Sequence, residues 1–128
     1  MGTSILVVED NDINYEIVST LLSMYGIVCQ RAENGKIALD IIANEENDGE
    51  FDLIFMDIQM PVMNGLDATR AIRKLDSEYA RTVPIIAMTA DAFSENIAEC
   101  FEAGMNAHIA KPIDINIVLA EIRKIKNK

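Results

Sequence analysis

The stretch FDLIFMD, residues 51–57, combines an apolar run with an aspartate at its end. A turn-forming segment, QMPVMNG, follows at residues 59–65. Short apolar runs without alternation are typical of parallel strands that are buried on both faces. Open α/β sheets bind ligands beyond the carboxyl ends of such strands. Asp57 is therefore the first candidate for a functional residue.

Five apolar runs of this kind alternate with helical patterns along the chain. They cover residues 5–8, 27–30, 53–56, 85–88 and 107–110. Between the first two runs the apolar residues repeat every four positions, at Ile13, Ile17, Leu21 and Tyr25, and a cleaner stripe runs from Ile115 to Ile125. Five strands that alternate with five helices predict a parallel sheet with right-handed crossovers and helices on both faces.

Capping residues mark the expected helix boundaries. Asparagine, aspartate or serine starts each of the first four helices and glycine ends the first and the fourth: Asn11 or Asp12 with Gly26, then Asn34-Gly35, Asn64-Gly65, and Ser94 or Asp91 with Gly104. The sequence contains no internal repeat, linker or low-complexity segment. We therefore expect one domain over residues 1–128, with a core from about residue 4 to about residue 126.

Composition narrows the class of protein. The 128 residues carry a formal net charge of −10, which argues against binding to nucleic acid or to an anionic membrane. Part of this acidity lies in residues 44–50, which we expect to be a solvated connection. No apolar stretch reaches the roughly 18 residues of a membrane span, and the amino terminus lacks a basic signal region. Cys29 and Cys100 show no metal-ligand spacing, so we expect two buried thiols in a reducing cytoplasm.

Chemistry-bearing side chains end four of the five expected strands. Glu9 and Asp10 follow the first run, Asp57 the third, Thr89 the fourth and Lys111 the fifth. Each alone has an ordinary explanation: capping acids, a turn former, a strand threonine and a surface lysine. Together they would meet at one edge of the sheet, where three carboxylates repel one another unless a cation lies among them. Mg²⁺ suits such ligands, and aspartate is a known phosphoryl acceptor.

Four motifs carry a resemblance to a known family: ILVVEDN at residues 5–11, FMDIQMP at 55–61, MTA at 88–90 and KP at 111–112. With their spacing, they make the whole chain similar to the receiver domain of two-component response regulators. The resemblance implies a flavodoxin-like, doubly wound (βα)5 fold whose parallel five-stranded sheet has the order 2-1-3-4-5, as in chemotaxis receivers.

The same resemblance implies a Mg²⁺ site. Asp10 and Asp57 would bind the ion through their carboxylates and Gln59 through its backbone carbonyl. Glu9 occupies the position of an acidic residue that acts largely through coordinated water.

Roles in phosphoryl transfer follow in the same way. Asp57 resembles the phosphoacceptor, Thr89 the hydroxyl that moves to the new phosphoryl oxygens, and Lys111 their ion-pairing partner. The family also implies a cis peptide bond between Lys111 and Pro112, which X–Pro chemistry permits.

Four positions refine this pattern. His108 stands where most receivers have a tyrosine or phenylalanine switch residue, so it is either a half-buried histidine at a strand edge or a pH-dependent switch. Gln59 and Asp91 match positions that tune the lifetime of the phosphoryl group. Ala90 is small and would keep the pocket open to a phosphodonor.

The implied function is transfer of a phosphoryl group from a phosphohistidine, on a sensor histidine kinase or a phosphotransfer domain, to Asp57. The transfer would bias a surface formed by the fourth helix, fifth strand and fifth helix, where partners or a second copy would bind. The receiver itself would only phosphorylate and dephosphorylate itself, at a cytoplasmic location.

Several alternatives stay open. QMPVMNG and TADAF (residues 89–93) resemble receivers of hybrid histidine kinases, so the chain is either excised from such a kinase or a stand-alone regulator. A degenerate receiver would act only as an interaction module. An aspartyl-phosphate phosphatase or mutase would place a second aspartate where Gln59 stands. A flavodoxin-like cofactor binder would need a phosphate loop in place of residues 9–12, EDND.

Overall fold

A five-stranded parallel sheet forms the centre of the computed structural model, which describes residues 3–58, 60, 62–89, 96–110 and 114–126. The strand order is β2-β1-β3-β4-β5, as expected. The strands are β1 (Ser4–Val8), β2 (Val28–Ala32), β3 (Leu53–Asp57), β4 (Ile85–Thr89) and β5 (Ala107–Ala110). All neighbours pair in parallel, so every carboxyl end lies at the same edge of the sheet.

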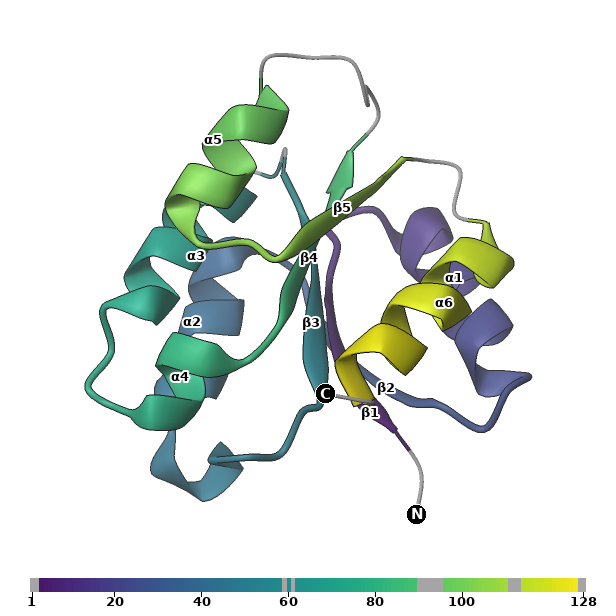
Figure 1. The fold of residues 1–128 in the computed structure, drawn as a ribbon, viewed down its shortest axis with the longest axis horizontal. Coiled ribbons are helices and arrows are strands. Elements are labelled where there is room, and N and C mark those ends of the chain that lie inside the picture. Colours follow the sequence, from purple (N-terminus) through teal and green to yellow (C-terminus); the bar gives the residue numbers. More distant parts are fainter. Residues whose placement is uncertain (1–2, 59, 61, 90–95, 111–113, 127–128) are drawn as a thin grey trace.

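Helices cover both faces of the sheet (Figure 1). The layer of α2 (Gly35–Ala43), α3 (Gly65–Arg73), α4 (Glu78–Thr82) and α5 (Asn96–Ala103) lies on one face. The opposite face is covered by α1 (Asp12–Ser23) and α6 (Ile115–Lys126). This arrangement is the doubly wound architecture that the alternation of strands and helices predicts.

Two apolar cores follow from the period of two along each strand. On β1, Leu6 and Val8 face the four-helix layer, where they join Ile72 of α3. Ile5 and Val7 face the opposite layer, where Leu22 of α1 packs. Each central strand therefore contributes to both cores, which explains why its sequence is continuously apolar.

The predicted caps of three helices are confirmed. The side-chain oxygens of Asn11, Asn34 and Asn64 each accept a hydrogen bond from the backbone N–H three residues later, at 3.0, 2.9 and 2.8 Å. Such bonds satisfy N–H groups that have no partner within the helix. The expected start of the fourth helix, at Ser94 or Asp91, lies outside the described residues.

Two expectations about the elements were wrong. The structure adds the short helix α4 and a 3-10 turn, Glu45–Asn47, to the five expected helices. The strand β2 lies at the sheet edge and is not buried on both faces, since only Ala32 of its five residues is buried. The helix expected from the four-residue repeat is present as α1, and the repeat itself faces solvent: Ile13 is 68% and Ile17 is 52% exposed, whereas Val18 and Leu22 are buried.

The two cysteines differ in burial. Cys100 is buried in the core, whereas Cys29 on β2 is only partly covered, so the expectation of two buried thiols holds for Cys100 alone. Burial raises the pKa of the Cys29 thiol to about 11, and burial likewise raises the pKa of Cys100. Both thiols are therefore weak nucleophiles near neutral pH. Within the described part of the chain, no helix has the length and apolar character needed to cross a membrane.

Candidate metal centre

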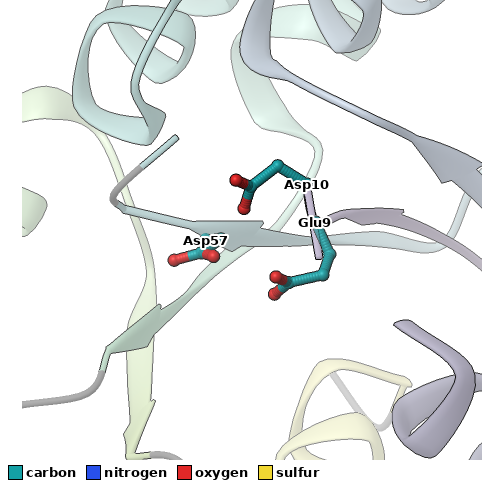
Figure 2. Close-up of side chains that lie close together, drawn as sticks. All are labelled: Glu9, Asp10 and Asp57. Atoms are coloured by element: carbon teal, nitrogen blue, oxygen red, sulfur yellow. The ribbon is translucent and has the colours of Figure 1, made fainter. Parts of the chain in front are cut away.

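The carboxylates of Glu9, Asp10 and Asp57 converge at the carboxyl edge of the sheet (Figure 2). Their meeting follows from strand pairing, because Val8 of β1 is paired with Met56 of β3. The residue after each of these is an acid, so Glu9 and Asp57 emerge side by side. One oxygen from each of the three side chains lies within 4.8 Å of the others.

The three acids differ in exposure. Glu9 and Asp57 are only 1% and 6% exposed, whereas Asp10 is exposed. The Glu9 carboxylate accepts a hydrogen bond from the backbone N–H of Asn11 at 3.1 Å. Carboxylates held this close repel one another, and burial reduces the screening by water. A cation that enters from the exposed Asp10 side would relieve this repulsion.

The donor set fits a hard divalent cation. Ligand oxygens about 2.1 Å from an octahedral Mg²⁺ ion are about 3.0 Å apart when adjacent and about 4.2 Å apart when opposite. The three carboxylate oxygens, all within 4.8 Å of one another, are therefore close enough for one ion to bind them after the side chains adjust. Carboxylate oxygens, rather than imidazole or thiolate groups, favour Mg²⁺ over softer metals. Glu9, Asp10 and Asp57 could therefore hold such an ion and leave further positions to water.

Thr89 lies on the strand next to Asp57. The pairing of Asp57 with Met88 places Thr89 one residue beyond Asp57 along β4, and its side chain is buried. The backbone N–H of Ile58 donates to the carbonyl of Met88 at 3.3 Å and extends the link between the two strands. Thr89 thus reaches the same edge of the sheet as the three acids.

Five of the predicted site residues lie outside the described residues: Gln59, Ala90, Asp91, Lys111 and Pro112. The roles assigned to them stay predictions.

His108 is partly buried on the edge strand β5. Its ring packs edge-on against Phe101 of α5, with ring centroids 6.2 Å apart and planes at 86°. This geometry is typical of a favourable aromatic pair. The role of His108 as a switch stays a prediction.

Arg31 is a residue near the site that the sequence patterns did not indicate. From β2 its Nε donates to the carbonyl oxygen of Glu9 at 3.1 Å, and its Nη1 lies 2.7 Å from Oδ1 of Asp12. Its guanidinium also lies 5.2 Å from the centre of the Tyr15 ring. No local pattern marks such a residue, because only the pairing of β1 with β2 brings Arg31 to the acids.

The chain matches the response regulator receiver domain family over residues 5–123. This chain belongs to that family. Among curated proteins, the receiver is 43% identical over 114 residues to the osmosensing histidine protein kinase SLN1 of Saccharomyces cerevisiae. It is 38% identical over 122 residues to the hybrid signal transduction histidine kinase M of Dictyostelium discoideum. These matches cover 88% and 94% of the receiver but only 9% and 5% of the two kinases.

Solved receiver structures share its fold. The receiver domain of the sensor histidine kinase PA1611 from Pseudomonas aeruginosa, with a magnesium ion in its active site cleft, superposes with a TM-score of 0.88 at 33% identity, and each chain is fully covered. A second neighbour is the receiver domain of Ssk1, crystallised with the histidine phosphotransfer protein Ypd1 of Saccharomyces cerevisiae. It gives a TM-score of 0.82 at 29% identity, covering 96% of this receiver and 88% of that chain.

Proposed function

We propose that this receiver domain accepts a phosphoryl group on Asp57 from a phosphohistidine, with Mg²⁺ held by Glu9, Asp10 and Asp57. The observation that carries the proposal is the convergence of these three carboxylates within 4.8 Å at the end of β1 and β3. In Figure 2 the three side chains turn toward one another from two neighbouring strand ends. The magnesium ion in the active site cleft of the PA1611 receiver supports the choice of metal.

In the proposed reaction, a carboxylate oxygen of Asp57 attacks phosphorus in line with the leaving histidine nitrogen. The P–N bond breaks as the new P–O bond forms, and the imidazole leaves with the bonding electron pair and takes up a proton. Bound Mg²⁺ neutralises the charge that gathers on the phosphoryl oxygens. Thr89 and Lys111 then bind the phosphoryl oxygens, and Gln59 supplies its backbone carbonyl to the metal.

The proposed output surface is formed by α5, β5 and α6. These elements are the fourth helix, the fifth strand and the fifth helix that the sequence predicts. Movement of Thr89 toward the phosphoryl group would shift the start of the segment between β4 and α5. His108 and Phe101 join β5 to α5 in this surface. A partner or a second copy of the receiver would bind there.

The histidine donor is a kinase or a phosphotransfer domain. SLN1 and the hybrid kinase M, which are similar to this receiver, are histidine kinases, and the Ssk1 receiver crystallised with a phosphotransfer protein. We therefore favour an origin within a hybrid histidine kinase on the cytoplasmic side of a membrane over a stand-alone regulator. Any kinase activity would then belong to the rest of that chain.

Intact mass after incubation with acetyl phosphate tests the proposal. We expect a gain of one phosphoryl group that requires Mg²⁺ and is lost in Asp57→Asn. Asp40→Asn, which changes an exposed carboxylate on α2 that pairs with Lys36, is the matched control and should gain the group. If wild type gains nothing from acetyl phosphate or from a phosphorylated histidine protein, the chain is a degenerate interaction module and the proposal fails.

A further inference from the structure

The main chain of Glu9 is held by two consecutive residues of β2. The register pairs Val7 with Arg31 and Val8 with Ala32, so Glu9 lies just beyond the last pair. Its N–H donates to the carbonyl of Ala32 at 3.0 Å, and its own carbonyl accepts from Nε of Arg31 at 3.1 Å. The second bond is made by a side chain, so it depends on the amino acid at position 31.

Arg31 is itself held in one orientation. Its Nη1 lies 2.7 Å from Asp12, at the start of α1, and its guanidinium lies 5.2 Å from the Tyr15 ring centre. Such contact with an aromatic face attracts a guanidinium. The Arg31 side chain is only 21% exposed, whereas its partner Asp12 is 88% exposed, so the bond to the Glu9 carbonyl is better shielded from solvent than the ion pair with Asp12.

The contacts of Arg31 do not satisfy all of its nitrogens. Its Nη2 is buried and has no hydrogen-bond partner among the described residues. An unsatisfied buried N–H group destabilises a fold. The other two nitrogens meanwhile bind the carbonyl of Glu9 and the carboxylate of Asp12, which flank Asp10 on either side.

We propose that Arg31 is a positioning residue of the metal centre, which holds the turn between β1 and α1 in the shape that presents Glu9 and Asp10 to the ion. The carbonyl that Arg31 binds belongs to the peptide group between these two acids. Holding that peptide plane fixes the position of the Asp10 Cα atom, which lies in the plane. The inference rests on the proposed metal site and assigns Arg31 no contact with the ion.

Charge alone predicts the opposite effect. A guanidinium that contacts the main chain of Glu9 places a positive charge near the metal centre and repels an incoming cation, so removal of Arg31 would strengthen metal binding if only its charge mattered. Positioning predicts weaker binding, because groups that orient metal ligands raise affinity through the geometry that they impose. The sign of the change therefore separates the two explanations.

Lysine at position 31 separates charge from geometry. It keeps the positive charge, but a single ammonium cannot reproduce the planar fork by which Arg31 binds a carbonyl and a carboxylate together. Arg81 on α4 supplies the matched control, because its Nη1 also contacts a carboxylate, Asp76, and a carbonyl, that of Leu75, at 3.6 and 3.4 Å. Arg81 precedes β4 and therefore lies toward the opposite edge of the sheet.

The experiment measures Mn²⁺ binding by the electron paramagnetic resonance of the free ion, then its displacement by Mg²⁺, without any phosphodonor. We expect Arg31→Ala and Arg31→Lys to weaken the affinity for both ions about tenfold or more, and Arg81→Lys to leave it within about twofold of wild type. Phosphorylation of Arg31→Lys by acetyl phosphate should recover at saturating Mg²⁺, because the reacting groups are unchanged.

Several outcomes would overturn the inference. Unchanged affinity in Arg31→Lys, or tighter binding in Arg31→Ala, would leave Arg31 with a charge effect only. Loss of cooperative thermal unfolding in both variants would make Arg31 a residue of the fold instead of the site. If the wild-type receiver bound neither Mn²⁺ nor Mg²⁺, both the proposed metal site and the inference about Arg31 would be refuted. Wild type that binds the ions but takes no phosphoryl group would refute the proposed function alone.

Discussion

Gly65 lies against the main chain of Asp57 where α3 begins. Its N–H donates to the carbonyl of Ile58 at 2.9 Å. A Cβ atom at this position would overlap the carbonyl oxygen of Asp57 and lie 2.9 Å from Cγ of Met56. The backbone of the proposed phosphoacceptor thus keeps its place because residue 65 has no side chain.

We expect Gly65→Ala to lower the free energy of unfolding by about 1–3 kcal/mol, because the added methyl must displace the backbone of Asp57. Metal affinity should fall as well. Gly49→Ala is the control, because Gly49 has a φ of +75° but nothing within 4 Å of its would-be Cβ. Gly49→Ala should lower the free energy of unfolding by about 1 kcal/mol, because alanine disfavours a positive φ, and should bind the metal with normal affinity. Urea unfolding and Mn²⁺ titration measure both effects, and normal affinity in Gly65→Ala would contradict the argument.

The short helix α4 is tied to β3 by one side chain. The hydroxyl of Tyr79 donates to the carbonyl of Phe51 and accepts from its N–H, both at 2.9 Å. These bonds satisfy the main chain of Phe51, two residues before β3 begins. Burial raises the pKa of Tyr79, so the hydroxyl stays neutral and able to donate well above neutral pH.

Tyr79→Phe should therefore lower the free energy of unfolding by about 1–3 kcal/mol, because it leaves the N–H and carbonyl of Phe51 without this partner. Tyr25→Phe is the control, since Tyr25 is exposed and should tolerate the change. Chemical denaturation compares the two variants. Equal stability of both would show that water replaces the Tyr79 hydroxyl without loss.

At its outer face, α1 exposes Ile13 and Ile17 beside the metal centre, since the helix begins two residues after Asp10. A groove on this face is lined by Ile13, Glu16, Ile17, Thr20 and Leu21. The proposed reaction requires the histidine-bearing partner to approach the edge of the sheet where Asp10 is exposed. We therefore expect an apolar surface of that partner to seat on this face of α1.

The double variant Ile13→Ser with Ile17→Ser should slow phosphoryl transfer from a histidine phosphotransfer protein about tenfold or more, because a few fully desolvated contacts carry most of the binding energy of an interface. Labelling by acetyl phosphate should not change, since a small donor needs no docking surface. Val28→Ser, at an equally exposed apolar position on β2, is the control. Slowing with both donors would instead point to damage at the metal centre.

The whole molecule has a formal net charge of −10, and three of its carboxylates gather at one edge of the sheet. Self-repulsion of this kind destabilises a compact state. A cation that binds the folded chain at Glu9, Asp10 and Asp57 would remove part of that repulsion and shift the folding equilibrium.

Mg²⁺ should therefore raise the free energy of unfolding, by about 2.7 kcal/mol when its concentration is 100 times the dissociation constant. Thermal unfolding with and without Mg²⁺ measures the effect. NaCl at the same ionic strength controls for screening, and Asp10→Asn should lose most of the stabilisation. An equal rise with NaCl would show that the ion acts by screening alone.

The sequence by itself determined the alternation of strands and helices, the asparagine caps and the set of acids at the strand ends. These features are local: a period of two or four, a cap three residues from its acceptor, or an acid after an apolar run. The sheet order was also expected, but through the family resemblance. Local patterns were weaker for α4, whose five residues are too few to show a period.

Only the tertiary structure decided which sides of the elements are buried and which distant residues meet. The apolar repeat of α1 predicted a helix but not its orientation, because two faces carry apolar side chains and the sheet covers only the one with Val18 and Leu22. Arg31 lies 22 positions from Glu9, and only the register of β1 with β2 brings the two together. Register is set by the hydrophobic patterns of the two paired strands and by the connection between them, so neither strand alone specifies it.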